Sequence, residues 1–314
     1  MKNSEIFFGK DIISLDQFDR KSIEFLFQEV KKIKKTPVKK LLKTLQGKIV
    51  GLMFFEPSTR TFSSNSAAVK RLGGQTVEHQ NPFVTSSAVK GETIEDTVKM
   101  MEQYCDLLII RHPIKGTLKI AADAASVPVI NAGDGIGEHP TQALLDMFTI
   151  FEKHKHLNNI RGLMAGDMLN GRTVHSLIRG LSMYSGNTIY LLSPKQLKLS
   201  REEFVYYTKK GIKLIEISSI DEIPDDCHFW YWTRVQKERF TDKNEYEKLK
   251  LSFILTKKLV DERAGKNTLI MHPLPRVGEI EVAVDSDPRS VYLNTEAKNG
   301  MFVRMALIKL ILSK

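Results

Sequence analysis

The sequence predicts an α/β protein made of two doubly wound parallel-sheet domains. Short apolar strands alternate with longer helical patterns, and this alternation runs twice along the chain. The length of 314 residues agrees with this prediction, because it suits two domains of roughly 150 residues each. Hydrophobic residues make up 42% of the chain, which is enough for a sizeable core in each domain.

The elements of the first series follow from runs and spacings of apolar side chains. Ile49 to Phe55 is among the longest apolar runs and has the length of a buried strand. The helix after it is closed by Gly73 and Gly74, and the next helix repeats apolar residues at helical spacing. The expected elements are strand 49–55, helix 62–72, helix 94–104, strands 106–110 and 127–130, and a helix from 141 to about 153.

The pattern then restarts with short strands rich in β-branched and aromatic residues. In α/β sheets ligands bind beyond the carboxyl ends of the strands, so the polar residues directly after each strand are the candidates for a site. The expected elements are strand 163–165, helix 172–183, strands 188–192, 229–232 and 268–271, and helix 297–312.

Composition and charge narrow the class of protein. Lys and Arg number 47 against 37 Asp and Glu, and this net charge of +10 suits an anionic metabolite or a nucleic acid. The densest basic run, Lys31–Lys43, contains no aromatic residue and predicts a solvated helix face and loop. Cys105 and Cys227 are far apart and form no CxxC pair, which argues against a disulfide framework or a zinc site. With no membrane-spanning run and no signal peptide in the sequence, we expect a cytoplasmic protein.

The segment Glu56–Thr61, EPSTRT, lies between the first strand and the first helix. A helix N-terminus offers free N–H groups and a positive dipole end, which favour an anion. The hydroxyls of Ser58, Thr59 and Thr61 and the guanidinium of Arg60 add donors that match phosphate. The segment is not a P-loop, because it lacks GxxxxGK[ST]. It predicts a phosphate site built from side chains, with an ordinary helix cap as the alternative.

Further polar groups follow other expected strands. Arg111 would be a second cation for the same anion. His139 and Gln142 are three residues apart and share a helix face, where they could bind a small polar ligand. Arg172 and Arg234 suit a dicarboxylate, because a guanidinium binds a carboxylate at two points. Taken singly, a solvated arginine or a structural histidine is the alternative for each.

Two other loops have a different character. Residues 85–93 are small, polar and glycine-containing, with Lys90 at the tip, which predicts a mobile loop or an ordinary surface loop. Residues 271–276 contain two X-Pro bonds in close succession, which indicate a rigid turn that admits a cis bond. Such a turn can present backbone carbonyls to a ligand, or it simply ends a strand.

Taken together, these segments resemble the aspartate/ornithine carbamoyltransferase family. TRVQKER and HPLPR are similar to the aspartate members in particular, since ornithine enzymes typically show HCLP at the second motif. The motifs occur in the family's order: FFEPSTRT (54–61), KGET (90–93), RHP (111–113), HPTQALLDMFTI (139–150), GRTVHSL (171–177), TRVQKER (233–239) and HPLPR (272–276).

The resemblance implies transfer of a carbamoyl group from carbamoyl phosphate to L-aspartate, an early step of de novo pyrimidine biosynthesis, without metal or cofactor. It implies a carbamoyl phosphate-binding domain of residues 1–139 plus 291–314, where the final helix packs back, and an aspartate-binding domain of residues 140–290. It also implies a homotrimer with shared active sites, in which Ser86 and Lys90 reach in from a neighbouring subunit. Whether a regulatory chain or a dihydroorotase partner binds stays open.

The residue roles implied by the resemblance divide into two groups. The implied catalytic residues are Arg60, Thr61, Lys90, Arg111 and His139. The implied substrate-binding residues are Ser58, Thr59, Ser86, Gln142, Arg172, Arg234, Gln236, Leu274 and Pro275.

The sequence departs from the family's pattern in two places. Phe62 stands where the family usually has an arginine, and Asn65-Ser66 stands where it has Phe-Glu. Positions 62 and 66 are an i,i+4 pair, so both charged partners are absent together and no unpaired charge remains. Gly278 stands where the family often has an aspartate, and the sequence offers no physical account of that change.

Four alternatives remain open at this stage. The acceptor could be ornithine, which Arg234 and the absence of HCLP argue against. The chain could be a catalytically silent scaffold, supported only by the departures above. Gly166–Gly171 after a strand suggests a nucleotide-binding dehydrogenase, but GDMLNG lacks GxGxxG. The basic charge alone would suit a nucleic-acid binder, whose binding would depend strongly on salt.

Overall fold

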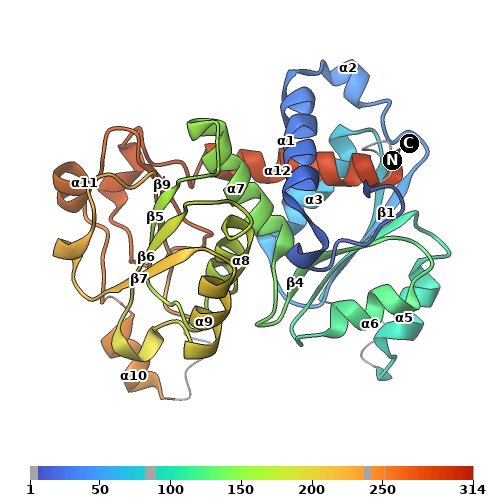
Figure 1. The fold of residues 1–314 in the computed structure, drawn as a ribbon. Coiled ribbons are helices and arrows are strands. Elements are labelled where there is room, and N and C mark those ends of the chain that lie inside the picture. Colours follow the sequence, from blue (N-terminus) through green and yellow to red (C-terminus); the bar gives the residue numbers. More distant parts are fainter. Residues whose placement is uncertain (1–5, 82–89, 237–241, 251, 314) are drawn as a thin grey trace. The chain divides into compact units, whose positions relative to one another are not determined.

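The computed structural model describes residues 6–81, 90–236, 242–250 and 252–313 (Figure 1). The chain forms two compact units, residues 1–145 with 299–314 and residues 146–298. The divisions fall within helix α7 (Pro140–His154) and helix α12 (Thr295–Leu312). Each unit contains one sheet whose strands all pair in parallel. The predicted class, two doubly wound parallel-sheet domains, is therefore confirmed.

The first unit has a four-stranded sheet in the order β2-β1-β3-β4. One face of it is buried against α5 and α6, with Met53, Leu108 and Ile110 each at most 1% exposed. Helix α3 packs against β1 and β2, and Phe62 of α3 lies edge-on to Phe54 of β1, with ring centroids 5.3 Å apart. The strands are β1 Ile49–Phe54, β2 Gln75–Gln80, β3 Leu107–His112 and β4 Val129–Asp134; the helices are η2 Leu15–Gln17, α1 Arg20–Lys35, α2 Val38–Leu41, α3 Thr59–Arg71, α5 Ile94–Met101 and α6 Thr117–Ala124.

The second unit has a five-stranded sheet in the order β7-β6-β5-β8-β9. Its core holds Trp230 and Trp232, both fully buried, against Leu259 and Val260 of α11. The strands are β5 Arg161–Ala165, β6 Thr188–Leu192, β7 Lys213–Ile217, β8 Phe229–Trp232 and β9 Leu269–Met271; the helices are α8 Arg172–Leu181, η4 Lys195–Leu197, α9 Arg201–Lys209, η5 Ile220–Glu222, α10 Lys243–Leu249, α11 Lys257–Arg263 and η7 Val282–Ser286.

The end of α12 packs on the first unit, as the resemblance implied. The backbone N–H of Gly9 donates to the carbonyl of Ile311 across 3.0 Å, and the ammonium of Lys309 lies 3.0 Å from the carboxylate of Glu29 on α1. The basic run forms the end of α1, the short α2 and their connections, and its lysines are exposed apart from the half-buried Lys31. The prediction of a solvated helix face and loop is therefore confirmed. Within the described residues, no helix is both long and apolar enough to cross a bilayer.

Two element boundaries differ from the prediction in ways that affect the site. Helix α3 begins at Thr59 and not at Phe62, so the predicted phosphate segment forms its first turn. Strand β3 runs on to His112, so Arg111 lies within the strand and not after it. The predicted bounds rested on apolar residues alone, and in both cases the element extends further, into neighbouring polar residues.

Candidate active site

In each sheet, candidate residues lie at the carboxyl ends of the two strands at which the strand order reverses. In the first unit the chain passes from β1 outward to β2, and β3 then lies on the other side of β1. In the second unit it passes from β5 to β6 and β7, and β8 then lies on the other side of β5. Such a reversal leaves a crevice at the carboxyl ends of the two strands, where ligands of α/β proteins bind. The EPSTRT segment follows β1, and Arg172 and Arg234 follow β5 and β8.

The first turn of α3 is exposed and rich in donors. Ser58 is the N-cap residue, and its side chain makes no capping hydrogen bond. The side chains of Thr59 and Arg60 are exposed, whereas Thr61 is only 7% exposed. The backbone N–H groups of a first helical turn have no partner within the helix. This turn therefore offers N–H groups, hydroxyls and a guanidinium to an anion.

Arg111 is held next to this turn by strand pairing. It lies opposite Phe54 in the β1–β3 register, and the N–H of Phe55 donates to its carbonyl across 2.9 Å. Its guanidinium is buried, lies 2.8 Å from the carboxylate of Glu56, and donates to the carbonyl of Ala132 across 3.4 Å. Burial lowers the pKa of Arg111, and the nearby Glu56 partly offsets this effect. A cation at the end of β3 is thus kept in place by one carboxylate.

A glycine makes room for that guanidinium. A Cβ on Gly133 in β4 would lie 2.9 Å from Nη1 of Arg111, and the φ of Gly133 is +133°. Any larger residue would therefore push the guanidinium aside and would also be strained.

His139 and Gln142 stand at the start of α7. His139 is 4% exposed, its Nδ1 lies 3.4 Å from Oγ1 of Thr141, and its carbonyl accepts from the N–H of Gln142 across 3.0 Å. Gln142 is half-buried. The sequence prediction that these two residues belong to one helix start is confirmed, and both lie in the first unit.

The second unit brings the loop after β5 and the segment 233–236 together across paired strands. Ala165 of β5 pairs with Trp232 of β8, and the N–H of Thr233 donates to the Ala165 carbonyl across 2.8 Å. A Cβ on Gly166 would lie 2.2 Å from the carbonyl oxygen of Thr233. Gly166 is thus required by a close approach of two loops, not by a bound nucleotide, which removes the one feature that suggested a dehydrogenase.

Asp167 organises these loops and was not singled out from the sequence. It is fully buried, and its Oδ1 accepts from the N–H of Asn170 across 2.9 Å. The side chain of Gln236 donates to the carbonyl of Asn170 across 2.6 Å. Burial raises the pKa of Asp167, and hydrogen bonds from Asn170 partly oppose this. The available signal was an aspartate between a glycine and a helix start, directly after β5.

The HPLPR turn follows β9, which pairs with β8. The Leu274–Pro275 peptide bond is cis, as the sequence admitted, and Leu274 has a φ of +50°. Leu274 is half-buried and Pro275 is exposed. Arg276 forms a two-point ion pair with Asp285, in which Nη2 lies 2.6 Å from Oδ2.

Some predicted residues stand apart from these groups. Lys90 is exposed and lies four residues before the start of α5. Ser86 lies outside the described residues.

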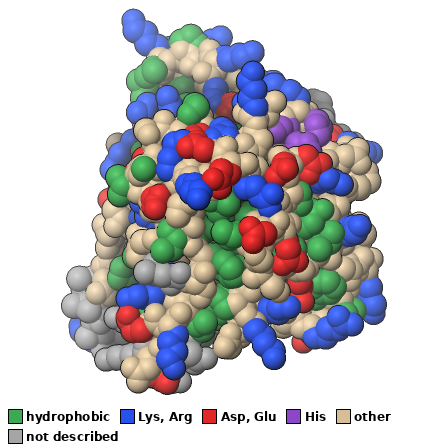
Figure 2. Space-filling view, turned by 90° about the vertical axis from the view of Figure 1, so that its left-hand side faces the viewer, with side chains coloured by type: hydrophobic (Ala, Val, Ile, Leu, Met, Phe, Trp, Pro, Cys, Tyr) green, Lys and Arg blue, Asp and Glu red, His purple; other side chains and the backbone are tan. Residues whose placement is uncertain are grey.

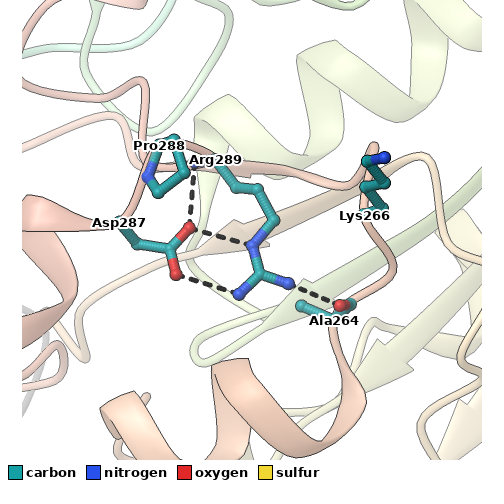
Figure 3. A pocket seen from close by; sticks show the side chains of 5 residues that line it. All are labelled: Ala264, Lys266, Asp287, Pro288 and Arg289. Carbon is teal, nitrogen blue, oxygen red and sulfur yellow. Dashed lines mark hydrogen bonds and ion pairs between the residues drawn. The ribbon is translucent and has the colours of Figure 1, made fainter.

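One surface hollow is unrelated to the predicted site. It has a volume of about 420 Å³ and is lined by Ala264, Lys266, Asp287, Pro288 and Arg289 (Figure 3). The guanidinium of Arg289 is taken up by Asp287, with Nε and Nη2 each 2.9 Å from a carboxylate oxygen, and by the carbonyl of Ala264 at 2.5 Å. The guanidinium of Arg289 is therefore already paired with groups of the same hollow.

The two departures from the family's pattern have physical accounts. Phe62 is buried against Phe54. The hydroxyl of Ser66 donates to the carboxylate of Glu78 in β2 across 2.7 Å, so a carboxylate is present beside α3, although another residue supplies it. Gly278 has a φ of +115°, which L side chains rarely adopt, so an aspartate would be strained in this backbone.

Comparisons with known proteins agree with this geometry. Residues 10–152 match the family model "aspartate/ornithine carbamoyltransferase, carbamoyl-P binding domain", and residues 158–311 match the "Asp/Orn binding domain" of the same family. The chain is 44% identical to the aspartate carbamoyltransferase catalytic subunit of Methanobrevibacter smithii, over 97% of this chain and 95% of that protein.

Solved structures resemble the chain over nearly its whole length. The catalytic subunit of M. jannaschii aspartate transcarbamoylase has a TM-score of 0.87 and 40% identity, covering 96% of this chain and 97% of that one. The aspartate transcarbamoylase of Trypanosoma cruzi, in complex with N-(phosphonacetyl)-L-aspartic acid, has a TM-score of 0.88 and 35% identity, covering 98% and 96%. Both sheets, both sets of strand-end loops and both family models agree: the chain belongs to the aspartate/ornithine carbamoyltransferase family.

Proposed function

We propose that this chain transfers the carbamoyl group of carbamoyl phosphate to the α-amine of L-aspartate, giving N-carbamoyl-L-aspartate and phosphate. The observation that carries the proposal is the Ser-Thr-Arg-Thr turn at the start of α3, with exposed Thr59 and Arg60, beside the buried Arg111. Full-length relatives with the names given above support aspartate as the acceptor. The product is an early intermediate of pyrimidine biosynthesis.

The phosphate of carbamoyl phosphate binds at the start of α3. Ser58, Thr59, Arg60 and Thr61 supply hydroxyls, a guanidinium and the free N–H groups of the first turn. Arg111 adds a second cation from the neighbouring strand. Binding by oriented donors and not by a metal suits a reaction in which phosphate is only the leaving group.

The carbonyl of carbamoyl phosphate becomes an oxyanion when the amine attacks. Thr61, Arg111 and His139 would donate to that oxygen, and each such preorganised donor typically contributes about 10²–10³ in rate. Gln142 and the backbone carbonyls of Leu274 and Pro275 would hold the carbamoyl NH₂. The result is a substrate fixed through its phosphate, its carbonyl oxygen and its amide.

The acceptor is held in the second unit. Arg172 and Arg234 would each bind one carboxylate of aspartate at two points, and Gln236 would add an amide donor. Asp167 positions this group through Asn170, whose carbonyl accepts from Gln236 across 2.6 Å. Two guanidiniums at the carboxyl ends of β5 and β8 suit a dicarboxylate better than they suit ornithine, which has one carboxylate and a second amine.

The chemical step is an addition followed by an elimination. The uncharged α-amine of aspartate attacks the carbonyl carbon, so a C–N bond forms and the C–O bond to phosphate breaks. The proton lost by the amine passes to the departing phosphate, which is itself a competent base. Lys90 would neutralise the substrate carboxylate and the departing phosphate. Alignment of two bound substrates lowers the barrier by several kcal/mol.

We assign carbamoyl phosphate binding to residues 1–139 with 291–314, and aspartate binding to residues 140–290. We also propose a cytoplasmic homotrimer in which Ser86 and Lys90 serve a neighbouring subunit, supported by the exposure of Lys90. The relatives named as catalytic subunits make a regulatory chain a reasonable partner, and a dihydroorotase is another. Mass measurement of the purified protein in solution separates a trimer from larger assemblies.

The deciding experiment offers carbamoyl phosphate with either L-aspartate or L-ornithine and detects the carbamoylated product by colour. Turnover with aspartate alone is expected. Turnover with ornithine alone would overturn the acceptor assignment and keep the phosphate site, while no turnover with either would favour the scaffold alternative.

A nucleic-acid role has little support, since Lys and Arg side chains are interspersed with Asp and Glu on the face drawn in Figure 2.

A further inference from the structure

The HPLPR turn is braced from inside the second unit by a buried histidine. His272 is 2% exposed, and hydrogen bonds engage both its ring nitrogens. Its Nδ1 accepts from the backbone N–H of Leu274 across 2.8 Å. A ring nitrogen that accepts from an N–H carries no proton, so in the neutral imidazole the proton lies on Nε2. Nε2 therefore donates to Oε1 of Glu279, which lies 2.7 Å away.

The second carboxylate oxygen of Glu279 links His272 to a later residue of the same turn. Oε2 accepts from the backbone N–H of Val277 across 2.8 Å, while the Glu279 carbonyl accepts from the N–H of Leu255 across 2.9 Å. Glu279 is only 2% exposed, which by itself raises the pKa of its carboxyl. The hydrogen bonds from His272 and Val277 outweigh this and lower the pKa, so the carboxylate is charged.

A second carboxyl group holds the other end of His272. The backbone N–H of His272 donates to Oε2 of Glu296 across 3.1 Å, and Glu296 is 2% exposed. His272 is thus fixed at its backbone by Glu296 and at its ring by Glu279. Leu274 and Pro275 lie in the chain between His272 and Glu279; Leu274 is half-buried and Pro275 is exposed.

We propose that Glu279 and Glu296 are positioning residues, which fix His272 and through it hold the backbone carbonyls of Leu274 and Pro275 where they accept the carbamoyl N–H groups. The inference rests on the proposed function, which assigns those carbonyls to the carbamoyl amide. The two N–H groups of a planar amide need hydrogen-bond acceptors at fixed positions. The carbonyls of Leu274 and Pro275 meet this need because both belong to one turn that hydrogen bonds hold in place. Neither glutamate touches the substrate in this scheme.

Glu279→Gln tests the brace with little change of shape. One carboxylate oxygen becomes an NH₂ group, so either the N–H of Val277 or the Nε2–H of His272 faces a donor in place of an acceptor. Affinities for carbamoyl phosphate and for inorganic phosphate are then measured by titration calorimetry on the native and variant chains. We expect carbamoyl phosphate to bind about tenfold more weakly, as loss of one hydrogen bond would cause, and inorganic phosphate to bind within about twofold, because it lacks an amide.

A purely structural role predicts something different. It would lower the fraction of active protein and reduce the binding stoichiometry of both ligands, with both affinities unchanged. Glu262→Gln, at an exposed carboxylate of α11, is the matched control and should change neither affinity.

A second variant covers the case in which Glu279→Gln does not fold. In His272→Asn the amide oxygen takes the place of Nδ1 and keeps the contact to Leu274, but nothing reaches Glu279. It should weaken carbamoyl phosphate binding to a similar degree, and the double variant should lose no more than either single one, because both remove the same contact.

The outcomes separate the two proposals. Unchanged affinity for carbamoyl phosphate in a folded Glu279→Gln or His272→Asn chain overturns the positioning role proposed here and leaves the proposed function intact. Failure of the native chain to bind carbamoyl phosphate overturns the proposed function, and the positioning role with it.

Discussion

Nη2 of Arg111 lies 2.8 Å from Oε2 of Glu56, so the most buried cation of the proposed phosphate site is paired with the residue that opens the EPSTRT segment. Removing the partner leaves a guanidinium charge in a poorly solvated place. We expect Glu56→Ala to lower the free energy of unfolding by about 1–2 kcal/mol, a value reduced for the partial exposure of Glu56. Urea denaturation measures it. Asp123→Ala, which breaks an exposed pair with Lys119, is the control, and equal effects of both variants would contradict the expectation.

Arg60 and Arg71 offer a matched pair of variants to test the proposed phosphate site, because both are exposed arginines of α3. Arg60 stands in the first turn and Arg71 at the last position of the helix. Arg60→Ala should lower turnover by about 10²–10³, whereas Arg71→Ala should leave turnover within about twofold. Steady-state kinetics at saturating aspartate distinguishes them. A loss of only a few-fold for Arg60→Ala would remove the phosphate-site assignment.

Restoring the family's glutamate at position 66 should destabilise this chain. The Ser66 hydroxyl donates to Glu78 across 2.7 Å, so Ser66→Glu would place two carboxylates together. We expect a loss of about 1 kcal/mol in unfolding free energy, largely recovered in the double variant with Glu78→Gln. Thermal unfolding of the four proteins of this cycle gives the coupling. Strict additivity would show that positions 66 and 78 do not interact.

Acid should destabilise the fold through His154 at the end of α7. Burial lowers the pKa of His154 from 6.5 to about 4, and its ring lies 4.9 Å from that of His228, whose pKa is also lowered by burial. The unfolded chain binds a proton at higher pH than the folded one, so the stability is full above pH 6.5 and is lost as the pH falls toward 4. His154→Gln should flatten the dependence of melting temperature on pH in this window. An unaltered slope would mean that other groups dominate.

Gly278→Asp should also destabilise the chain, although it restores a residue common in the family. The φ of +115° at this position costs an L side chain about 1–3 kcal/mol. Urea denaturation provides the measurement, with Gly278→Ala as the control that separates backbone strain from added charge. Native-like stability of both variants would show that the turn relaxes easily.

The sequence was informative where an apolar run marked a strand or where polar residues followed a strand. The class of fold, most strands and the groups around Arg60 and Arg234 were predicted in this way. Strand β2 was not predicted, because QTVEHQ has no apolar run, and its partly exposed edge position explains why it needs none. Strand β7 was also missed, and so was helix α1, although its buried side chains Ile23, Leu26, Phe27, Val30 and Ile33 recur at helical spacing.

Three-dimensional pairing accounts for the rest. Asp167 and Glu279 do their work through partners such as Asn170 and His272 and through backbone N–H groups, and no local pattern announces such contacts. The role of Gly278 likewise depends on a dihedral angle that residue type alone does not reveal.

The reversal of strand order in the second sheet has a consequence for how such enzymes diverge. Arg172, Arg234 and Gln236 all follow β5 or β8, so they belong to a single contiguous stretch of the gene. If these residues bind the acceptor as proposed, changes confined to that stretch can alter which amine is accepted and leave the proposed phosphate-binding turn of α3 unchanged. A relative that uses a new acceptor can therefore keep the same donor substrate and the same binding turn for its phosphate.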